Sequence, residues 1–244
     1  STALKQQYLQ RANKLNATEA DVAFDLARVY RDSKQNQAAY DVLQIAIAAD
    51  TSNLILQQAL LPVANLLSKY KEVVVAGEKL MKNGTDANVV RDVAKAYFFL
   101  KNYKKAISLY QMLEQMSMQN EGTLYYTSLC YRELKNYEMA AAYAKRTIEE
   151  GISPNTSAYY NMLGGIYDEK QQLTGAITAY KKGLSYDSNK NIQYRLGLLY
   201  DLKLKQSKTA LSYYNQFLKN TALNEEDKPQ IAYIKARIEE FKKK

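Results

Sequence analysis

The sequence contains no histidine, one cysteine, three prolines and nine glycines in 244 residues. Without histidine, Ser/His and Cys/His nucleophile pairs and histidine-ligated zinc or iron sites are excluded. The single cysteine, Cys130, excludes an intramolecular disulfide framework and a multi-cysteine metal site. No phosphate-binding loop is present either. We therefore expect no enzymatic activity and no cofactor.

The scarcity of proline and glycine argues against long turn-rich or disordered segments. Ala, Leu, Lys, Gln and Glu are abundant, which favours an all-α fold. The most apolar run, LLPVANLL, is short and interrupted, far from the roughly 18 to 20 residues of a membrane helix. The first residues contain no basic segment followed by an apolar one, so we expect that any export signal has been removed or never existed.

Tyrosine recurs with a long period. The segment LGGIY at 163–167 resembles LGLLY at 196–200, VAKAY at 93–97, TSLCY at 127–131 and LARVY at 26–30. The final tyrosines are 67, 34, 36 and 33 residues apart, and the gap of 67 is two periods with Ala64 in the missing place. Self-similarity at a fixed period indicates a repeat architecture, here of six units.

Each unit is expected to be a helical hairpin. A small residue begins a second helix after a short polar turn such as KNYKKA or KNYEMA; it stands at Ala39, Ala106, Ala140, Ala176 and Ala210, with Val73 in the second unit. This pattern resembles the tetratricopeptide repeat. The resemblance implies a right-handed superhelical α-solenoid of helical hairpins.

The resemblance divides the chain into three parts. We expect an N-terminal helix within 1–19, six repeats within 20–224 and a C-terminal capping helix at 225–244. The repeat boundaries are placed at about 20–53, 54–86, 87–120, 121–156, 157–189 and 190–224. The second repeat is irregular, because Leu61 replaces the small residue and Ala64 the tyrosine. Pro62 should kink or delay its first helix.

The ends and two glycines have packing interpretations. Ile231, Ile234, Ile238 and Phe241 fall on one side of the terminal helix, where they can cover the last apolar face. Gly164 occupies the small-residue position at which the first helix must approach its partner closely. Gly165 is the next residue round the same helix, on a face where the other units carry large side chains, and its missing side chain should leave a gap on that face.

Family resemblance places the first helices on the concave side and predicts a peptide-binding groove. The nine candidate residues are Arg28, Arg91, Lys95, Phe98, Tyr125, Arg132, Asn161, Asp168 and Tyr194. Cations and amides there can meet carboxylate or backbone oxygens, and aromatic rings can cover apolar side chains. We expect a non-catalytic scaffold that binds a peptide segment of another protein. In its sharper form the prediction is an acidic segment that docks across Arg91, Lys95 and Arg132, with Phe98 and Tyr125 as margins.

Other readings stay open. The chaperone-binding carboxylate clamp of the family is incomplete, because Tyr126, Ala158 and Met162 occupy places that it needs. The net charge of +9 suggests a nucleic-acid- or anionic-surface-binding protein, with Lys203, Lys205, Lys208 and the tail Lys242 to Lys244 as its basic end. Uneven charge along the chain makes nucleic acid the less favoured partner. The oligomeric state is open; Lys- and Tyr-rich arrays resemble bacterial examples, many exported, which favours an exported over a cytoplasmic protein.

Overall fold

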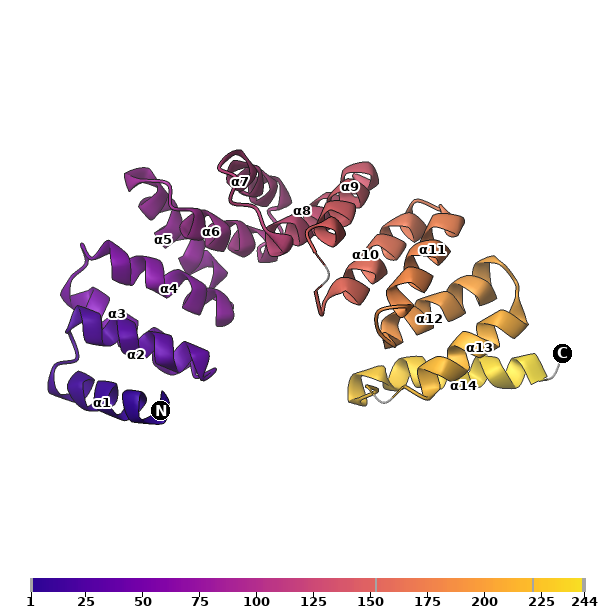
Figure 1. The fold of residues 1–244 in the computed structure, drawn as a ribbon, viewed down its shortest axis with the longest axis horizontal. Helices are drawn as coiled ribbons and strands as arrows, with labels where there is room; N and C mark the ends of the chain where they lie inside the picture. The colour runs from indigo at the N-terminus through magenta and orange to yellow at the C-terminus, as the bar shows by residue number, and fades with distance from the viewer. Residues whose placement is uncertain (1, 152, 221, 243–244) are drawn as a thin grey trace. The chain divides into compact units, whose positions relative to one another are not determined.

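The computed structural model describes residues 2–151, 153–220 and 222–242, and this part of the chain contains helices and no strand. The all-α prediction is therefore confirmed. The chain divides into two compact units, unit 1 (Ser1–Gln119) and unit 2 (Asn120–Lys244), and each is described by itself. Figure 1 gives the positions of the helices within each unit.

Unit 1 is built from helices that pack in chain order. They are α1 (Thr2–Leu15), α2 (Ala20–Asp32), α3 (Asn36–Ala49), α4 (Leu54–Leu66), α5 (Tyr70–Asn83), α6 (Ala87–Phe99) and α7 (Tyr103–Gln115). α2 pairs with α3, α4 with α5 and α6 with α7, while α1 packs on α2. Gln10 of α1 donates a hydrogen bond of 3.0 Å to the Tyr30 hydroxyl.

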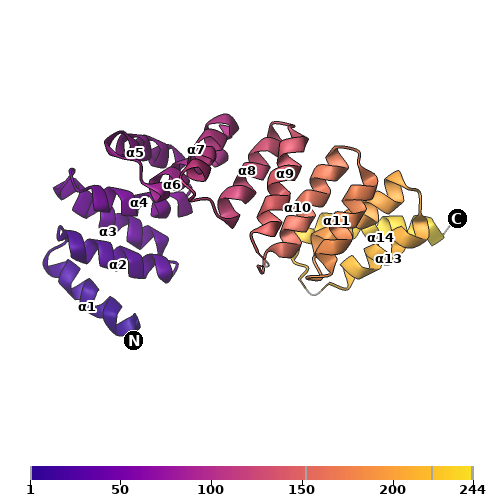
Figure 2. The ribbon, with the colours of Figure 1, turned by 45° about the horizontal axis from the view of Figure 1, so that its top comes forward.

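Unit 2 continues the same hairpin pattern, and Figure 2 shows its helix pairs side by side. Its helices are α8 (Glu121–Glu133), α9 (Tyr137–Glu149), α10 (Thr156–Glu169), α11 (Leu173–Leu184), α12 (Lys190–Leu198), the π-helical turn η1 (Leu199–Lys203), α13 (Ser207–Leu218), the 3-10 turn η2 (Glu225–Asp227) and α14 (Lys228–Lys242). Pairs form between α8 and α9, α10 and α11, and α12 and α13.

The recurring tyrosine, replaced by Ala64 in the second hairpin, lies close to the end of each first helix. The Tyr97 carbonyl accepts a hydrogen bond of 2.9 Å from the Asn102 amide, a reach of five residues that closes a Schellman-type cap. Between them Lys101 adopts a left-handed conformation, with φ of 60°. The same five-residue bond recurs at each of the first five hairpin turns, and in the sixth, which follows the π-helical turn, the Gln206 amide reaches the Tyr200 carbonyl six residues back. The left-handed residues of the six turns are Lys34, Ser68, Lys101, Lys135, Gln171 and Lys205.

Apolar side chains between the helices make the core of each unit. In unit 2 the last cluster contains Tyr180, Tyr214 and Phe217, all at most 1% exposed, together with Ile234 of α14. Ile231, Ile238 and Phe241 pack against the same cluster. The terminal helix therefore covers the apolar face that the last hairpin would otherwise expose, as predicted.

The irregular second hairpin folds without a delayed first helix. We predicted that Pro62 kinks or delays this helix; α4 begins at Leu54 and contains Pro62, so the helix is not delayed, and the kink stays a prediction. Asn53 caps the helix by accepting a hydrogen bond of 3.1 Å from the Leu56 amide. With this cap in place, the helix starts two turns before the proline, whose ring affects only the turn that precedes it.

Candidate functional site

The nine candidate residues all lie on first helices. Four are in unit 1, on α2 and α6, and five are in unit 2, on α8, α10 and α12. The unit 1 residues are Arg28, Arg91, Lys95 and Phe98, and the unit 2 residues are Tyr125, Arg132, Asn161, Asp168 and Tyr194. The two sets differ in how their charges are matched.

In unit 1, cations gather around a half-buried carboxylate, Asp92 of α6. Burial raises the pKa of Asp92 to about 6, against the opposing effects of a hydrogen bond from Asn65 and of the charges on Lys95, Arg91 and Arg31. The Asn65 amide of α4 donates to both the Asp92 side chain and its carbonyl at 3.1 Å. We call Arg31, Arg91 and Lys95 the cationic cluster.

The members of the cationic cluster have few anionic partners. Lys95 forms no ion pair with any residue that the structure describes. Arg91 donates to the Asn88 side chain at 2.8 Å and to the Met118 carbonyl at 3.3 Å, and its buried Nε atom has no partner. Arg31 pairs with its exposed neighbour Asp32, at 3.3 Å. An added carboxylate would therefore find unused donors here.

A small recess lies beside this cluster. It has a volume of about 100 Å³ and is lined by Phe24, Ala27, Arg28, Arg31, Leu43, Ala59 and Val63. Arg28, at its edge, is exposed and pairs with Asp25 at 3.4 Å. Phe98 belongs to an aromatic group on α6 and α7, with Phe99 at 5.2 Å and Tyr103 at 5.9 Å between ring centroids. Apolar surface is thus available next to the cations.

In unit 2, the corresponding charges are matched to one another. Arg132 of α8 donates to Glu169 of α10 at 2.9 Å, Lys203 of η1 bonds Asp168 of α10 at 2.6 Å, and Arg237 of α14 bonds Asp201 of η1 at 2.6 Å. Each pair joins one repeat to the next helical element along the chain. We call these three pairs the ion-pair ladder. Its cations already have carboxylate partners.

The other candidates in unit 2 are engaged in packing. The Tyr125 ring lies 5.4 Å from that of Tyr159, and the Tyr194 ring lies 5.6 Å from that of Phe217 and 6.5 Å from that of Tyr233 on the capping helix. Asn161 keeps one buried side-chain oxygen without a hydrogen-bond partner. Tyr194 therefore contributes to the attachment of α13 and α14.

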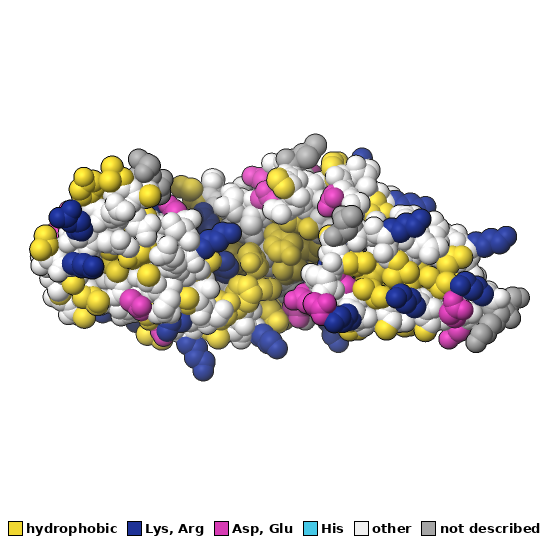
Figure 3. Space-filling view, turned by 90° about the horizontal axis from the view of Figure 1, so that it is seen from below, with side chains coloured by type: hydrophobic (Ala, Val, Ile, Leu, Met, Phe, Trp, Pro, Cys, Tyr) yellow, Lys and Arg dark blue, Asp and Glu magenta, His cyan; other side chains and the backbone are white. Residues whose placement is uncertain are grey.

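The basic end proposed for nucleic acid is partly neutralised. Lys203 is paired with Asp168, and Lys242 with Glu239 at 2.7 Å. Lys205 and Lys208 are exposed, while Lys243 and Lys244 lie outside the described residues. Figure 3 shows Lys and Arg side chains scattered over the face in view, with Asp and Glu side chains between them. Such spacing is weaker support for a polyanion surface than a continuous basic stripe would be.

Sequence reasoning missed Asp92, Glu169 and Arg237. Glu169 and Arg237 stand one repeat beyond their partners, and that spacing was the signal that could have found them. Asp92 follows a candidate, Arg91, but nothing in the sequence shows that Asn65 packs over it. Cys130, in contrast, is 0% exposed, and burial raises the pKa of its thiol to about 12, as expected for a packing residue.

Comparisons with known proteins agree with the fold. Residues 123–150, 157–190 and 192–220 match family models described as Tetratricopeptide repeat. A TPR repeat-containing protein of Methanocaldococcus jannaschii is 26% identical over 227 residues, which is 90% of this chain and 36% of that protein. The chain covers still less of the other curated proteins that it matches.

Two solved structures resemble the chain over most of its length. A tetratricopeptide repeat protein from Parabacteroides merdae has a TM-score of 0.67 and 14% identity, covering 98% of this chain and 91% of that one. Pseudomonas aeruginosa pilF has a TM-score of 0.66 and 16% identity, covering 87% and 96%. At these identities the likeness concerns the fold. None of the described helices has the length and apolar character that crossing a bilayer requires.

Proposed function

Because the chain is a tetratricopeptide-repeat protein, whose stacked hairpins form a protein-interaction scaffold, we propose that unit 1 binds an acidic segment of another protein at the cationic cluster. The observation that supports this choice is that the charges of Arg31, Arg91 and Lys95 all act on one half-buried carboxylate, Asp92, while Lys95 has no ion pair among the described residues. In unit 2 the ion-pair ladder already satisfies its cations. A ligand carboxylate there would have to displace a protein carboxylate.

The chemistry of the cluster suits a carboxylate-bearing chain. Arg91 presents a guanidinium with an unused Nε donor, and Lys95 an ammonium without an ion-pair partner among the described residues. Charged hydrogen bonds made in such a partly sheltered place are stronger than those of exposed pairs. The recess beside Phe24 and Arg28 is large enough for one small apolar side chain of the same ligand. The ligand would then combine acidic residues with at least one apolar residue.

Proteins of this family are generally non-catalytic scaffolds, and we extend that to this chain. The alternative, a nucleic-acid or anionic-surface binder, is favoured by the charge of +9 but would use Lys205 and Lys208 instead of the cationic cluster. The two functions therefore depend on different units, and charge reversal in each unit can separate them.

Fluorescence anisotropy with a short labelled peptide of Asp, Glu and Leu tests the proposal. Arg91→Glu with Lys95→Glu should weaken binding at least about tenfold, since two attractive interactions become repulsive. Lys104→Glu is the matched control, because Lys104 is an exposed cation of the same unit on α7. Its affinity should stay within about twofold of the wild type.

Circular dichroism should show equal helix content in all three proteins. Loss of peptide binding in the Lys205→Glu, Lys208→Glu variant, with binding retained in the α6 variant, would contradict the proposal and favour the basic end. A labelled oligonucleotide run in parallel would identify that second function directly.

A further inference from the structure

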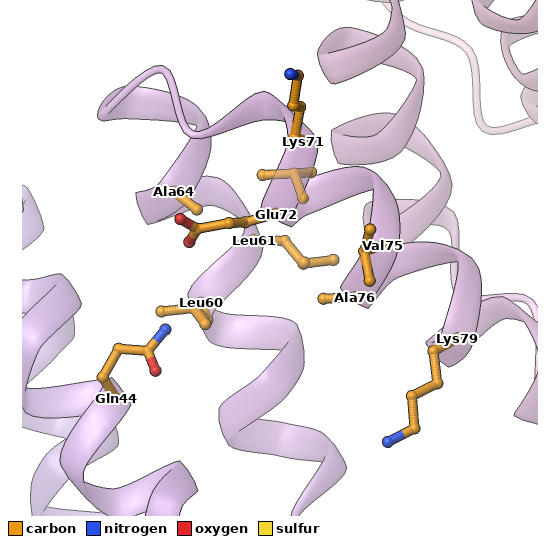
Figure 4. Close-up of a pocket in the computed structure, with 10 residues that line it drawn as sticks. Gln44, Leu60, Leu61, Ala64, Lys71, Glu72, Val75, Ala76 and Lys79 are labelled. Carbon is orange, nitrogen blue, oxygen red and sulfur yellow. The ribbon is translucent and has the colours of Figure 1, made fainter.

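A larger apolar pocket lies elsewhere in unit 1, on the irregular second hairpin. Its volume is about 450 Å³. Figure 4 shows Leu60, Leu61 and Ala64 of α4 facing Val75 and Ala76 of α5, with Gln44 of α3 at one side. None of these residues belongs to the cationic cluster or to the recess beside it. The pocket is therefore a separate surface.

Ala76 explains why space is left at this hairpin. The position three residues after the recurring small residue holds a larger side chain in four of the other hairpins, Val42, Leu109, Tyr143 and Tyr213, and a buried alanine, Ala179, in the fifth. Leu109 and Tyr143 are buried there, so they fill the equivalent space. Ala76 ends at its Cβ atom and leaves that space open. A buried cavity of this kind would lower stability, but an open one exposes apolar walls to a ligand.

Val75 makes the rim apolar as well. It is 73% exposed, whereas the equivalent residues are Asp41, Ser108, Ala142, Thr178 and Ser212, all polar or small. A large apolar side chain that is exposed next to an apolar pocket marks an interaction surface more specifically than a scattered one. The second hairpin thus differs from all the others at Val75 and from four of the other five at Ala76, and both residues favour a bound apolar group.

Two lysines stand at opposite ends of the pocket. Lys71 and Lys79 flank Val75 along α5 in Figure 4, each four residues away from it. The two lysines are therefore eight residues, or about 12 Å, apart on one helix face. Both are exposed, and neither forms an ion pair with a residue in the described part of the chain.

The one carboxylate at the pocket is already occupied. Glu72 accepts a hydrogen bond of 2.5 Å from the Tyr40 hydroxyl of α3 and lies 3.4 Å from the Lys69 ammonium. These contacts join α3 to α5 and direct the charge of Glu72 toward α3. The net charge that a ligand meets at the two ends of the pocket is consequently positive.

We propose that this pocket binds an amphipathic helix of a partner protein, which inserts one large apolar side chain and places an acidic residue one turn to either side. Acidic, apolar and acidic residues at i, i+4 and i+8 reproduce the spacing of Lys71, Val75 and Lys79 on α5. The apolar residue would fill the space above Leu61 and Ala76. Binding here is independent of the acidic segment proposed for the cationic cluster.

A designed helical peptide with Glu, Leu and Glu at this spacing, labelled for fluorescence anisotropy, tests the proposal on the full chain. The wild type should bind it. Ala76→Leu, which restores the residue found at Leu109, should abolish binding while keeping or raising the melting temperature. Lys71→Glu with Lys79→Glu should weaken binding about tenfold, and a peptide with Lys in place of both Glu residues should restore it.

Matched variants make the outcome decisive. Lys104 has the same position on α7 as Lys71 has on α5, so Lys104→Glu should leave the affinity for the helical peptide unchanged. Arg91→Glu with Lys95→Glu, at the cationic cluster, should leave it unchanged as well. Equal binding to wild type and Ala76→Leu, or no binding to the wild type, would overturn the proposal. So would a concentration-dependent dimer in analytical ultracentrifugation that Ala76→Leu removes, because the pocket would then hold a second copy of this chain.

Discussion

The ring of Tyr180 lies directly against the backbone of Gly164. A Cβ atom at Gly164 would lie 2.5 Å from both Cδ1 and Cε1 of this ring, which is closer than any ordinary contact. Tyr180 is 0% exposed, so its ring could move aside only by displacing its neighbours. The adjacent Gly165 differs, since a Cβ there would meet nothing closer than the Arg195 guanidinium at 3.6 Å.

Gly164→Ala and Gly165→Ala should therefore have opposite effects. Gly164→Ala should lower the free energy of unfolding by about 1–3 kcal/mol, because overpacking outweighs the gain in helix propensity. Gly165→Ala should be neutral or raise it by up to about 1 kcal/mol. Urea unfolding followed by circular dichroism measures both. The opposite order would mean that the packing face of α10 is assigned wrongly.

This contact also shows how much of the fold was available from the sequence. The small residue of the first helix and the tyrosine of the second were each visible as repeats, and the hairpins followed from them. The sequence did not show that this small residue and this tyrosine contact each other, although Gly197 and Tyr214 repeat the contact in the last hairpin. In the second hairpin the large and small residues are exchanged: Leu61 of the first helix stands at the position of Gly164, and Gly77 of the second helix stands at the position of Tyr180. Complementary sizes become meaningful only when the facing positions are known.

The candidate site was less predictable for a related reason. First-helix positions could be assigned by family resemblance, and all nine candidates do lie on first helices. Which charges are satisfied depends on side chains about one repeat away, such as Glu169 for Arg132 and Asp168 for Lys203. Burial also decides the charge of Asp92, and it depends on packing that no local pattern encodes.

The hairpin turns offer a stabilising substitution on the surface. Lys101 adopts a left-handed conformation with φ of 60°, which costs a residue with a Cβ atom about 1–2 kcal/mol. Lys101→Gly should raise the free energy of unfolding by about 0.5–1 kcal/mol, after the extra entropy of unfolded glycine is deducted. Urea unfolding checks this. Lys104→Gly, in the first turn of α7, should instead be destabilising; equal effects of the two would refute the argument.

The last step of the ion-pair ladder should anchor the capping helix. Asp201 is 4% exposed; burial tends to raise its pKa, but hydrogen bonds from Arg237 and Tyr214 and the charge of Arg237 lower it overall. Arg237→Gln should cost about 2–4 kcal/mol near neutral pH, because it leaves a buried carboxylate with a weaker partner.

This loss should shrink in acid. Wild-type Asp201 contributes stability above its ordinary pKa of 3.8 and loses it as the pH falls through the lower folded value. Without Arg237, the Asp201 carboxyl takes up its proton at a higher pH than in the wild type, and the neutral form removes the penalty of burying its charge. Melting curves at neutral pH and near pH 4 test this. Lys242→Gln, which affects an exposed pair on the same helix, is the control and should change little at either pH.

Asp92 should have the opposite pH dependence. Its pKa of about 6 in the folded protein lies above the ordinary 3.8, because burial disfavours the charged form more than Asn65 and the nearby cations favour it. The folded state therefore holds the proton more tightly, and stability falls as the pH rises from about 4 to about 6. Asp92→Asn cannot ionise and keeps an oxygen for the Asn65 amide. Its melting temperature should match that of the wild type near pH 4 and exceed it above pH 6, where the unfolding free energies should differ by about 3 kcal/mol.

The same titration should control ligand binding at the cationic cluster. As the pH falls through about 6, Asp92 becomes neutral and its negative charge no longer offsets Arg31, Arg91 and Lys95. An acidic peptide stays ionised down to about pH 5, so its affinity for the wild type should rise over this interval. Asp92→Asn should bind tightly at both pH values and show a flat profile. Anisotropy titrations between pH 5 and pH 7.5 test this, and a variant as pH-dependent as the wild type would place the acidic ligand away from the cluster.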